Sequence, residues 1–384
     1  MTRVEAYWRR LPESLRLSLI YFAVTRLVFT ILGTASIKLI GHYSSEVHHV
    51  VFKYIPSVTG IPFLDMWTQW DSGWYLHIAQ HGYQNIPDLN GQTDIAFFPL
   101  YPYLIRFLSW PFHYNTKAVV VIGLLISSVA FIAAAHFLYK LVAKKFSPKI
   151  ARLTLLMLFI SPASFIFSSV MTESLFFLLL VLAFTWIEEN RWWWVGLASG
   201  LLVLTRPAAL PLMVAIGAIY LMRDRFDWRR LLRWESLWII GPLIGLGIWL
   251  LINHSITGNL FGFVHAERAW QRGFLTLHGP SGDLLTLQGL YLLAFPIATI
   301  LLVSRFIKKI GWEYWLMTFT LLILPILSGL YGLIRYISVV FPLYIALALL
   351  VESRKNWHQP VLITLLLFQG VHFVWWALGM PIMQ

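Results

Sequence analysis

Long apolar segments separated by short polar connections make up most of the chain. A membrane-spanning helix needs about 20 mostly apolar residues to cross roughly 30 Å of hydrocarbon, and only helices and closed barrels satisfy their own backbone there. About eleven segments approach that length: 15–40, 117–141, 151–169, 173–188, 192–206, 207–222, 236–253, 286–304, 313–331, 336–351 and 360–379. The pattern predicts an all-α polytopic membrane protein in which residues 1–384 form one integral membrane domain.

Proline interrupts this pattern at two informative places. "TRPAALP" at 205–211 joins two apolar segments, and its prolines break a helix, so 192–222 is either one long kinked helix or a hairpin. "FFPLYP" at 97–102 excludes one simple helix through those residues. It lies in a long connection, 41–116, that we expect to be helical in part.

Composition supports the membrane assignment. The chain is 59% hydrophobic and 12% charged, with a mean hydropathy of +0.71, whereas soluble domains carry about 25% charged residues. The absence of cysteine excludes disulfides and thiolate sites. The basic start, "MTRVEAYWRRLPESLR", has no small-residue cleavage site, so we expect a retained first helix rather than a removed signal peptide.

The net charge of +12 follows from membrane orientation. Most of the 29 Lys and Arg residues lie in alternate connections, at 3–16, 140–152, 191, 223–233, 305–309 and 354–355. The positive-inside rule places those connections and the N-terminus in the cytoplasm, so nucleic acid is not an expected partner. The large loops at 41–116 and 254–285 are then extracytoplasmic. We expect the plasma membrane of a bacterium or an archaeon.

Unusual polar residues gather on the predicted outer side. Polar groups at membrane depth are costly and commonly functional. Those that approach the outer face are Asp71, Glu173, Arg206, His265, Glu267 and Arg335. They indicate a single site that opens to the extracytoplasmic surface.

Asp71 lies in the aromatic stretch "WDSGWYLHIAQHGY" at 70–83. One interpretation is an interfacial amphipathic helix with a solvated carboxylate. The other is a general base, because a partly dry aromatic setting raises the pKa of an aspartate. Helical spacing would place Asp71 on one face with Trp67, Trp74, Tyr75 and Ile78. The aromatic faces suit sugar rings, and the expected substrate contacts here are Trp70, Trp74, Tyr75 and His81.

Two arginines are candidates for phosphate binding. Arg206 and Arg335 lie at outer ends of predicted spans, and the guanidinium fork suits phosphate oxygens; the alternative is side chains that snorkel to water. Glu173 either orients an acceptor or caps a hairpin. His265 and Glu267 either line an acceptor cleft or belong to a solvated loop.

The sequence gives weaker support for a metal site and for a nucleotide-sugar donor. His77 and His81 have the i, i+4 spacing of metal ligands and lie near Asp71, but the set is loose, so no metal is assigned and no cofactor is expected to be required. Arg26 lies within the first span and calls for a partner that the sequence does not name. Without GxxxxGK[ST] or HExxH, a soluble nucleotide-sugar donor is unsupported.

Five motifs in this order resemble the PIG-V family: "WDSGWYLHIAQHGY", "FFPLYP", "SPASFIFSSVMTESLF", "GNLFGFVHAERAW" and "RYISVVFPLYI". The resemblance runs from about residue 65 to 345. It implies a GT-C glycosyltransferase that uses a polyprenyl- or dolichyl-phosphate-linked sugar, with Asp71 as the catalytic carboxylate of the first outer loop. "MTESLF" stands where "YSESLF" is usual and "LTRPAAL" replaces an "RSNG"-like stretch, which leaves the acceptor, lipid-linked or glycan, open.

The chemistry agrees with one strong carboxylate. A glycosidase needs two because its leaving group must be protonated, whereas a phosphate leaves as a stable anion. An inverting mannosyltransferase with Asp71 as its base is the expected function. A transporter or flippase of lipid-linked sugars remains an alternative, although such proteins commonly show internal repeats and none is visible here. A noncatalytic subunit of a glycosylation complex is a third.

Overall fold

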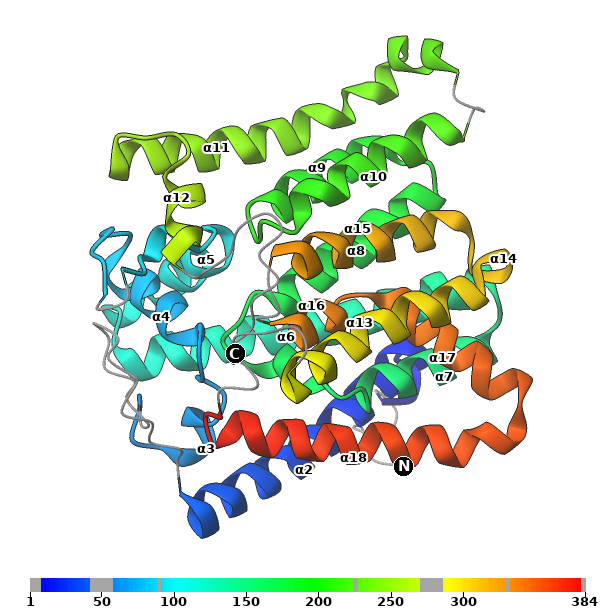
Figure 1. Cartoon of the computed structure of the whole chain (residues 1–384), viewed down its shortest axis with the longest axis horizontal. Helices are drawn as coiled ribbons and strands as arrows, with labels where there is room; N and C mark the ends of the chain where they lie inside the picture. The colour runs from blue at the N-terminus through cyan, green and yellow to red at the C-terminus, as the bar shows by residue number, and fades with distance from the viewer. Residues whose placement is uncertain are drawn as a thin grey trace.

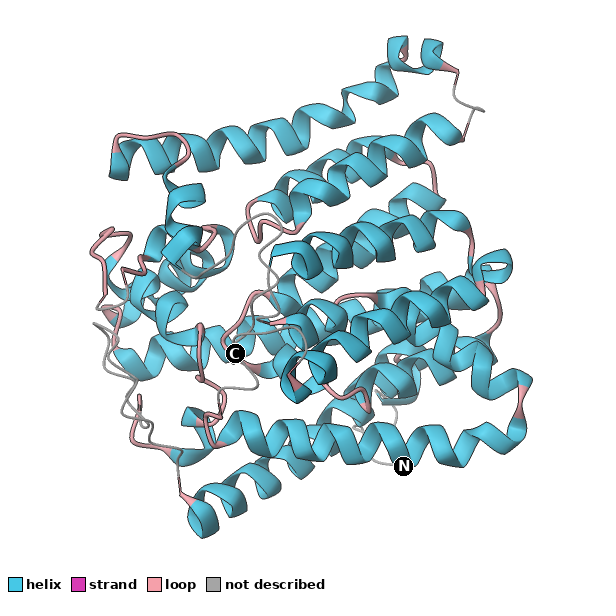
Figure 2. Ribbon diagram, in the orientation of Figure 1, coloured by secondary structure: helices cyan, strands magenta, loops and turns pink. Residues whose placement is uncertain are grey.

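A computed structural model describes residues 8–41, 58–88, 91–223, 227–269, 286–328 and 332–380, and these residues contain helices and no strand. The longer helices run side by side as one bundle (Figures 1 and 2). The α-helices are α2 (Glu13–Ile40), α3 (Pro62–Asp65), α4 (Ser72–His81), α5 (Leu100–Ser109), α6 (Thr116–Lys145), α7 (Pro148–Phe159), α8 (Glu173–Glu188), α9 (Trp192–Val203), α10 (Ala209–Met222), α11 (Ile240–Thr257), α12 (Gly262–Ala269), α13 (Leu287–Arg305), α14 (Ile307–Ile310), α15 (Trp312–Ser328), α16 (Leu333–Ser338), α17 (Phe341–Ser353) and α18 (His358–Ala377). The 3₁₀ helices are η1 (Asp94–Ala96), η2 (Trp110–Phe112), η3 (Ser164–Ser168), η4 (Trp228–Leu232), η5 (Trp234–Ile239) and η6 (Lys355–Trp357).

A helix lies in each of the predicted apolar segments. Five helical stretches are long and apolar enough to cross a membrane: Glu13–Ile40, Thr116–Lys145, Trp234–Thr257, Leu287–Arg305 and Lys355–Ala377. Shorter apolar helices, among them α9, α10, α15 and α17, pack beside them. The all-α membrane fold is therefore confirmed, while the count of eleven spans stays a prediction.

The segment 192–222 forms a hairpin rather than one kinked helix. α9 ends at Val203 and α10 begins at Ala209, and the two helices lie side by side in Figure 1. Pro207 lies between them, where it cannot continue an α-helix from α9. The break places Arg206 at one end of the bundle.

The predicted span 151–169 is not one helix. α7 ends at Phe159, and the chain continues through η3 as a buried irregular segment up to Glu173. Pro162 explains the break, because a proline disfavours helix in the residue before it. Gln369 of α18 provides a hydrogen-bond donor for two backbone carbonyls at this break. Its Nε2 donates to the carbonyls of Phe159 and Ser161 at 2.8 and 2.9 Å.

The predicted span 336–351 is also interrupted. It starts within α16, breaks at Val339 and Val340, and continues as α17, in which Pro342 occupies the first turn. Proline is tolerated there because that N–H has no intrahelical partner. The short helix α16 thereby carries Arg335 into the protein interior rather than to a helix end in lipid.

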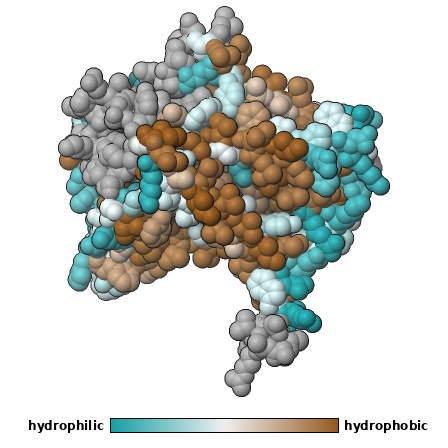
Figure 3. Space-filling view, turned by 90° about the horizontal axis from the view of Figure 1, so that it is seen from below, coloured by the Kyte–Doolittle hydropathy of each residue, from teal (hydrophilic) through white to brown (hydrophobic). Residues whose placement is uncertain are grey.

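Ion pairs join the connections that were predicted to be cytoplasmic. Arg152 pairs with Glu13 at 2.7 Å and Lys149 with Glu352 at 2.8 Å. Figure 3 shows an apolar band along the molecule with a strongly polar end beside it. The basic connections thus meet at one end of the bundle, and the first long loop covers the other.

Two long loops were predicted, at 41–116 and 254–285. In the first, α3, α4, η1, α5 and η2 form a helical layer over the bundle end (Figure 1); residues 42–57 and 89–90 lie outside the described residues. In the second, α12 packs against η1, and residues 270–285 lie outside the described residues. The first loop is helical in part, as expected.

Glycines bring α9 and α11 into backbone contact. Gly196 and Gly200 face Gly241 and Gly245, the small-xxx-small arrangement of close membrane helices. A Cβ atom at Gly241 would lie 2.0 Å from the carbonyl oxygen of Gly196, which is far inside van der Waals contact. Any side chain at this crossing must push the two helices apart.

We expect Gly241→Ala to lower the thermal stability of the detergent-solubilised protein by several degrees, because overpacking costs about 1–3 kcal/mol. Gly247→Ala is the matched control on the same helix, since a Cβ there meets nothing within 4 Å. Equal melting temperatures for the two variants would contradict the contact.

Candidate active site

Two hydrogen bonds from distant parts of the chain hold the backbone that leads to Asp71. Trp376 Nε1 of α18 donates to the carbonyl of Met66 at 3.0 Å, and the amide of Val170 donates to the carbonyl of Trp67 at 3.1 Å. Trp70 then adopts a left-handed conformation with φ 55°, which is uncommon for a large side chain and is often a sign of a functional constraint. Asp71 follows at the N-cap of α4, where the helix dipole favours its negative charge.

Arg335 connects two carboxylates that are distant in sequence. Its Nη1 donates to Asp71 Oδ2 at 2.6 Å, and its Nε donates to Glu173 Oε1 at 2.8 Å. Glu173 is fully buried at the first residue of α8, and Arg335 is 5% exposed. Because charge-assisted bonds in a low-dielectric setting are strong, these contacts fix the guanidinium beside Asp71.

Arg206 completes a group of four charges. Its Nη1 lies 3.1 Å from Glu173 Oε1, the oxygen that Arg335 already uses. The guanidinium also lies over the ring of Tyr336 at 4.8 Å, within the range of a cation–π contact. Arg206 Nη1 and Glu173 Oε2 are buried and make no hydrogen bond within the described part of the chain. Such unsatisfied buried polar atoms are rare in folded proteins and call for an explanation.

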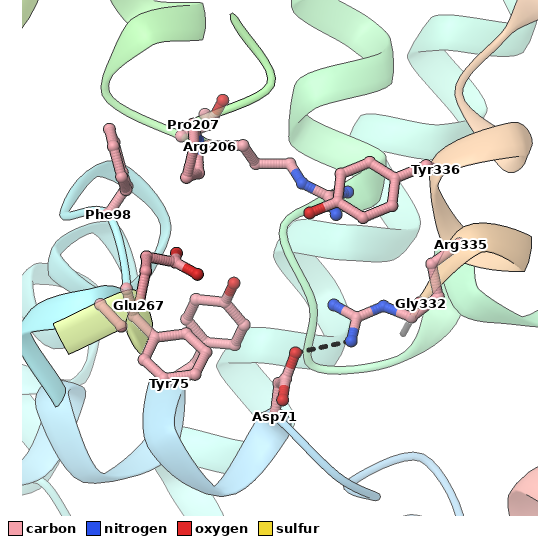
Figure 4. Close-up of a pocket in the computed structure, with 12 residues that line it drawn as sticks. Asp71, Tyr75, Phe98, Arg206, Pro207, Glu267, Gly332, Arg335 and Tyr336 are labelled. Atoms are coloured by element: carbon pink, nitrogen blue, oxygen red, sulfur yellow. Dashed lines mark hydrogen bonds and ion pairs between the residues drawn. The ribbon is translucent and has the colours of Figure 1, made fainter. Parts of the chain in front are cut away.

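These side chains line a small pocket that opens to solvent, with a cavity volume of about 50 Å³. In Figure 4, Asp71 and Arg335 meet on one side, while Arg206 and Tyr336 lie above them and Tyr75 and Glu267 face them. The lining residues are Asp71, Tyr75, Ala96, Phe97, Phe98, Thr205, Arg206, Pro207, Glu267, Gly332, Arg335 and Tyr336. The pocket combines a carboxylate, two guanidinium groups and aromatic walls.

Two of the expected aromatic contacts lie outside the pocket lining. Trp74 is buried and stacks on Phe97 at 5.6 Å, while Trp70 is half-buried beside Asp71. The expected helical face through Trp67 is wrong, because α4 starts only at Ser72 and the turn at Trp70 separates Trp67 from it. Trp74 contributes to the pocket by holding Phe97 in its wall.

Both histidines proposed for substrate binding are exposed and do not line the pocket. His81 contacts the ring of His77 at 4.9 Å, and His265 lies 3.2 Å from the carbonyl of Phe261 in α12. Among the described residues no group of three His, Cys, Asp or Glu side chains is arranged to bind a metal ion. Asp94 Oδ2 lies 3.9 Å from Nε2 of His77, the other histidine of the pair.

Arg26 does not pair with a carboxylate in the described chain. Its Nε donates to Ser168 Oγ at 2.7 Å and its Nη2 to the carbonyl of Ser164 at 2.8 Å, with the ring of Phe22 4.8 Å away. The buried guanidinium therefore anchors η3, the segment that leads to Glu173.

Sequence reasoning missed several lining residues. Tyr336 follows Arg335 within the quoted motif, and Thr205 and Pro207 flank Arg206. Phe98 belongs to "FFPLYP", whose Leu100 amide donates to the carbonyl of Leu204 at 3.0 Å and so joins this motif to the α9–α10 break. The sequence signal that could have found Thr205, Pro207 and Tyr336 is that each is adjacent in the chain to Arg206 or Arg335.

Comparison with known proteins identifies the family. The family model described as Mannosyltransferase (PIG-V) matches residues 19–210, half of the chain, including Asp71, Glu173 and Arg206. The chain belongs to the PIG-V mannosyltransferase family. This membership makes it a glycosyltransferase and favours the transferase over the transporter interpretation. A search of curated proteins found no match.

One solved structure, that of ArnT, supports the GT-C fold of this PIG-V family member. ArnT from Cupriavidus metallidurans, bound to undecaprenyl phosphate, superposes with a TM-score of 0.59 at 10% identity, covering 95% of this chain and 76% of ArnT. The Archaeoglobus fulgidus oligosaccharyltransferase tethered to an acceptor peptide gives 0.44 at 14% identity, covering 94% of this chain and 54% of that enzyme. Family membership and the fold shared with ArnT make the protein a multi-pass membrane glycosyltransferase with a GT-C fold.

A pH effect on stability is expected from the first loop. Burial lowers the pKa of His77 to about 4, and nearby His81 adds to this shift, whereas an unfolded histidine titrates near 6.5. The unfolded chain therefore binds more protons between these values, and stability is lost as the pH falls from about 6.5 towards 4. Burial raises the pKa of Asp94, 3.9 Å from His77, which opposes the loss at the acid end.

We expect His77→Phe to reduce the fall in melting temperature between pH 7 and pH 5, because the buried titrating group is removed. The control is His358→Gln, a change at an exposed histidine. An unchanged pH dependence in His77→Phe would contradict the assignment.

Proposed function

We propose that the protein is an inverting mannosyltransferase that moves mannose from a polyprenyl- or dolichyl-phosphate donor to a hydroxyl of a lipid-linked or glycan acceptor. The observation that carries the proposal is the 2.6 Å contact between Asp71 and Arg335 in an open pocket. Such a contact places a base and a phosphate-binding cation side by side. The undecaprenyl phosphate bound to ArnT supports the class of donor lipid.

Asp71 is the proposed general base. It removes the proton of the acceptor hydroxyl as that oxygen forms a bond to C1 of the sugar. The bond between C1 and the donor phosphate oxygen breaks, and its electron pair leaves with the polyprenyl phosphate, so the configuration at C1 is inverted. No general acid is needed, because the phosphate departs as an anion. General-base catalysis contributes about 10²–10⁴-fold to such rates.

Arg206 and Arg335 are the proposed phosphate ligands. Arg206 lines the pocket, and its Nη1 is paired with Glu173 at 3.1 Å without an aligned hydrogen bond among the described residues, which leaves the guanidinium capacity to donate to a phosphate. Glu173 holds both guanidinium groups through one oxygen, so we assign it a positioning role. Tyr75 and Glu267 face the same space and are proposed to contact sugar or acceptor.

Arg335 is proposed to change partners during the reaction. In the structure it is paired with Asp71. As transfer proceeds, Asp71 is protonated and loses its charge, while the phosphate gains a second negative charge. Arg335 can then exchange one anion for the other with little movement, and the net charge of the pocket stays constant. Preorganised groups that meet developing charge in this way are a major source of catalysis.

The charge pattern supports a proposed orientation of the protein in the membrane. With the basic connections in the cytoplasm, the pocket opens on the extracytoplasmic face of a bacterial or archaeal plasma membrane. Residues 1–384 act as one integral domain, in which 41–116 carries the catalytic segment and 254–285 forms the second outer loop. His81, His265, Trp70 and Trp74 do not line the pocket and remain candidate substrate contacts. No cofactor is required by this chemistry.

We expect Asp71→Asn to lower sugar transfer by about 10²–10⁴-fold, because the acceptor hydroxyl loses its base. The assay uses purified protein in lipid with radiolabelled polyprenyl-phosphate mannose and a panel of lipid and glycan acceptors. Retained donor binding is the control for folding. Equal activity in variant and parent would remove Asp71 from the mechanism, and movement of labelled lipid between leaflets without transfer would contradict the proposed function.

The partner exchange predicts a specific coupling in product binding. Asp71→Asn releases Arg335, so we expect it to tighten the binding of a short-chain polyprenyl phosphate several-fold. Arg335→Gln should weaken binding, and adding Asp71→Asn to it should then bring little gain. The measurement is a double-mutant cycle of dissociation constants.

Simple repulsion between Asp71 and the phosphate would give a different result. In that case Asp71→Asn would tighten binding at least as much in the Arg335→Gln background as in the parent. Arg335→Lys, which keeps the charge but not the fork, separates loss of charge from loss of geometry.

A further inference from the structure

We propose that a second site, at the end of the bundle opposite Asp71, binds the head group of an anionic phospholipid. A hollow of about 680 Å³ lies where the ends of α13 and α17 meet α14 and η6. Its cationic lining comes from two separate parts of the chain: Arg305, Lys308 and Lys309 from one, and Arg354 from the other. Its volume is that of a typical ligand site.

The cations of this hollow differ from others at the same end. Lys149 pairs with Glu352 at 2.8 Å and Arg152 with Glu13 at 2.7 Å. In contrast, Arg305, Lys308, Lys309 and Arg354 form no ion pair within the described ranges, and no carboxylate lines the hollow. The hollow therefore concentrates positive charge that the protein does not neutralise, although a carboxylate lies only two residues from Arg354.

Membrane orientation alone does not require this arrangement. The positive-inside rule and helix C-termini both favour basic residues here, but neither calls for two segments to converge on one concave surface. Cations from two segments that converge in this way are typical of a polyanion-binding site, where several cations reach one phosphate-bearing group.

The apolar part of the hollow points to a lipid rather than a soluble phosphate. Phe306, Leu350 and Trp357 contribute to the lining, and Trp357 is 49% exposed, as is common for tryptophan at a membrane interface. One helical turn before Arg305, Leu301 is 65% exposed on a helix apolar enough to span the membrane. A head group in the hollow could thus direct its acyl chains along α13.

The test compares two matched double variants in detergent. Lys308→Gln with Arg354→Gln removes one cation from each side of the hollow, and Lys149→Gln with Arg152→Gln removes the same charge from exposed, carboxylate-paired positions. Each membrane-proximal cation contributes about 1 kcal/mol to binding an anionic lipid. We therefore expect the first variant to bind dioleoylphosphatidylglycerol about ten-fold or more weakly than the parent, measured by native mass spectrometry, and the second to bind it as the parent does.

Two further probes identify the ligand. Dioleoylphosphatidylcholine should bind weakly to every variant, and glycerol phosphate should not displace the anionic lipid at equal concentration. Equal loss in both double variants would mean general surface charge and would overturn the site, as would parental binding by the hollow variant. Displacement by glycerol phosphate would overturn the lipid assignment in favour of a soluble phosphate. Melting temperatures without added lipid show that both variants remain folded.

Discussion

The buried contact of Arg335 with Asp71 and Glu173 is the constraint on which the rest of the site depends. Removing an ion from water costs several kcal/mol, and a buried charge left without its partner is strongly destabilising. Two arginines and two carboxylates close to one another offset this cost, with a net charge of zero among the four. They come from the N-cap of α4, the start of α8, the α9–α10 break and α16. These four places must therefore meet for any of them to be stable.

Each of these places is also where a regular helix stops or starts. Within a membrane protein, irregular backbone is tolerated where it is buried in protein or lines a cavity. Here Pro162, Pro207 and Pro342 create the interruptions, and Arg26 and Gln369 satisfy the backbone and hydroxyl groups of the segment after α7. The two carboxylates lie at helix N-termini, where the dipole favours negative charge. The interruptions of the helices thus form the pocket and also bring its charged side chains together.

The apolar pattern predicted the helices because hydrophobic length is a local property of the sequence. It also predicted that Asp71, Glu173, Arg206 and Arg335 reach one end of the bundle, since topology alternates. It could not reveal that Arg335 and Arg206 share one oxygen of Glu173, because no periodicity relates residues so far apart. The left-handed turn at Trp70 was hidden as well, and the assumption of a continuous helix through Trp67 failed there. Trp74, His81 and His265 were chosen by residue type, and residue type does not determine whether a side chain lines the pocket.

Because Arg335 lies in the second half of the chain, the site requires both halves of the fold. The matched PIG-V segment ends at residue 210 and already holds Asp71, Glu173 and Arg206, but this segment alone would leave two carboxylates and one buried cation. α16 supplies the missing cation and Tyr336, the ring beneath Arg206. Since an uncompensated buried carboxylate is costly, the first half should not hold Asp71 and Glu173 in this geometry without the second. The helices after residue 210 are therefore part of the proposed active site, and not only a membrane anchor for it.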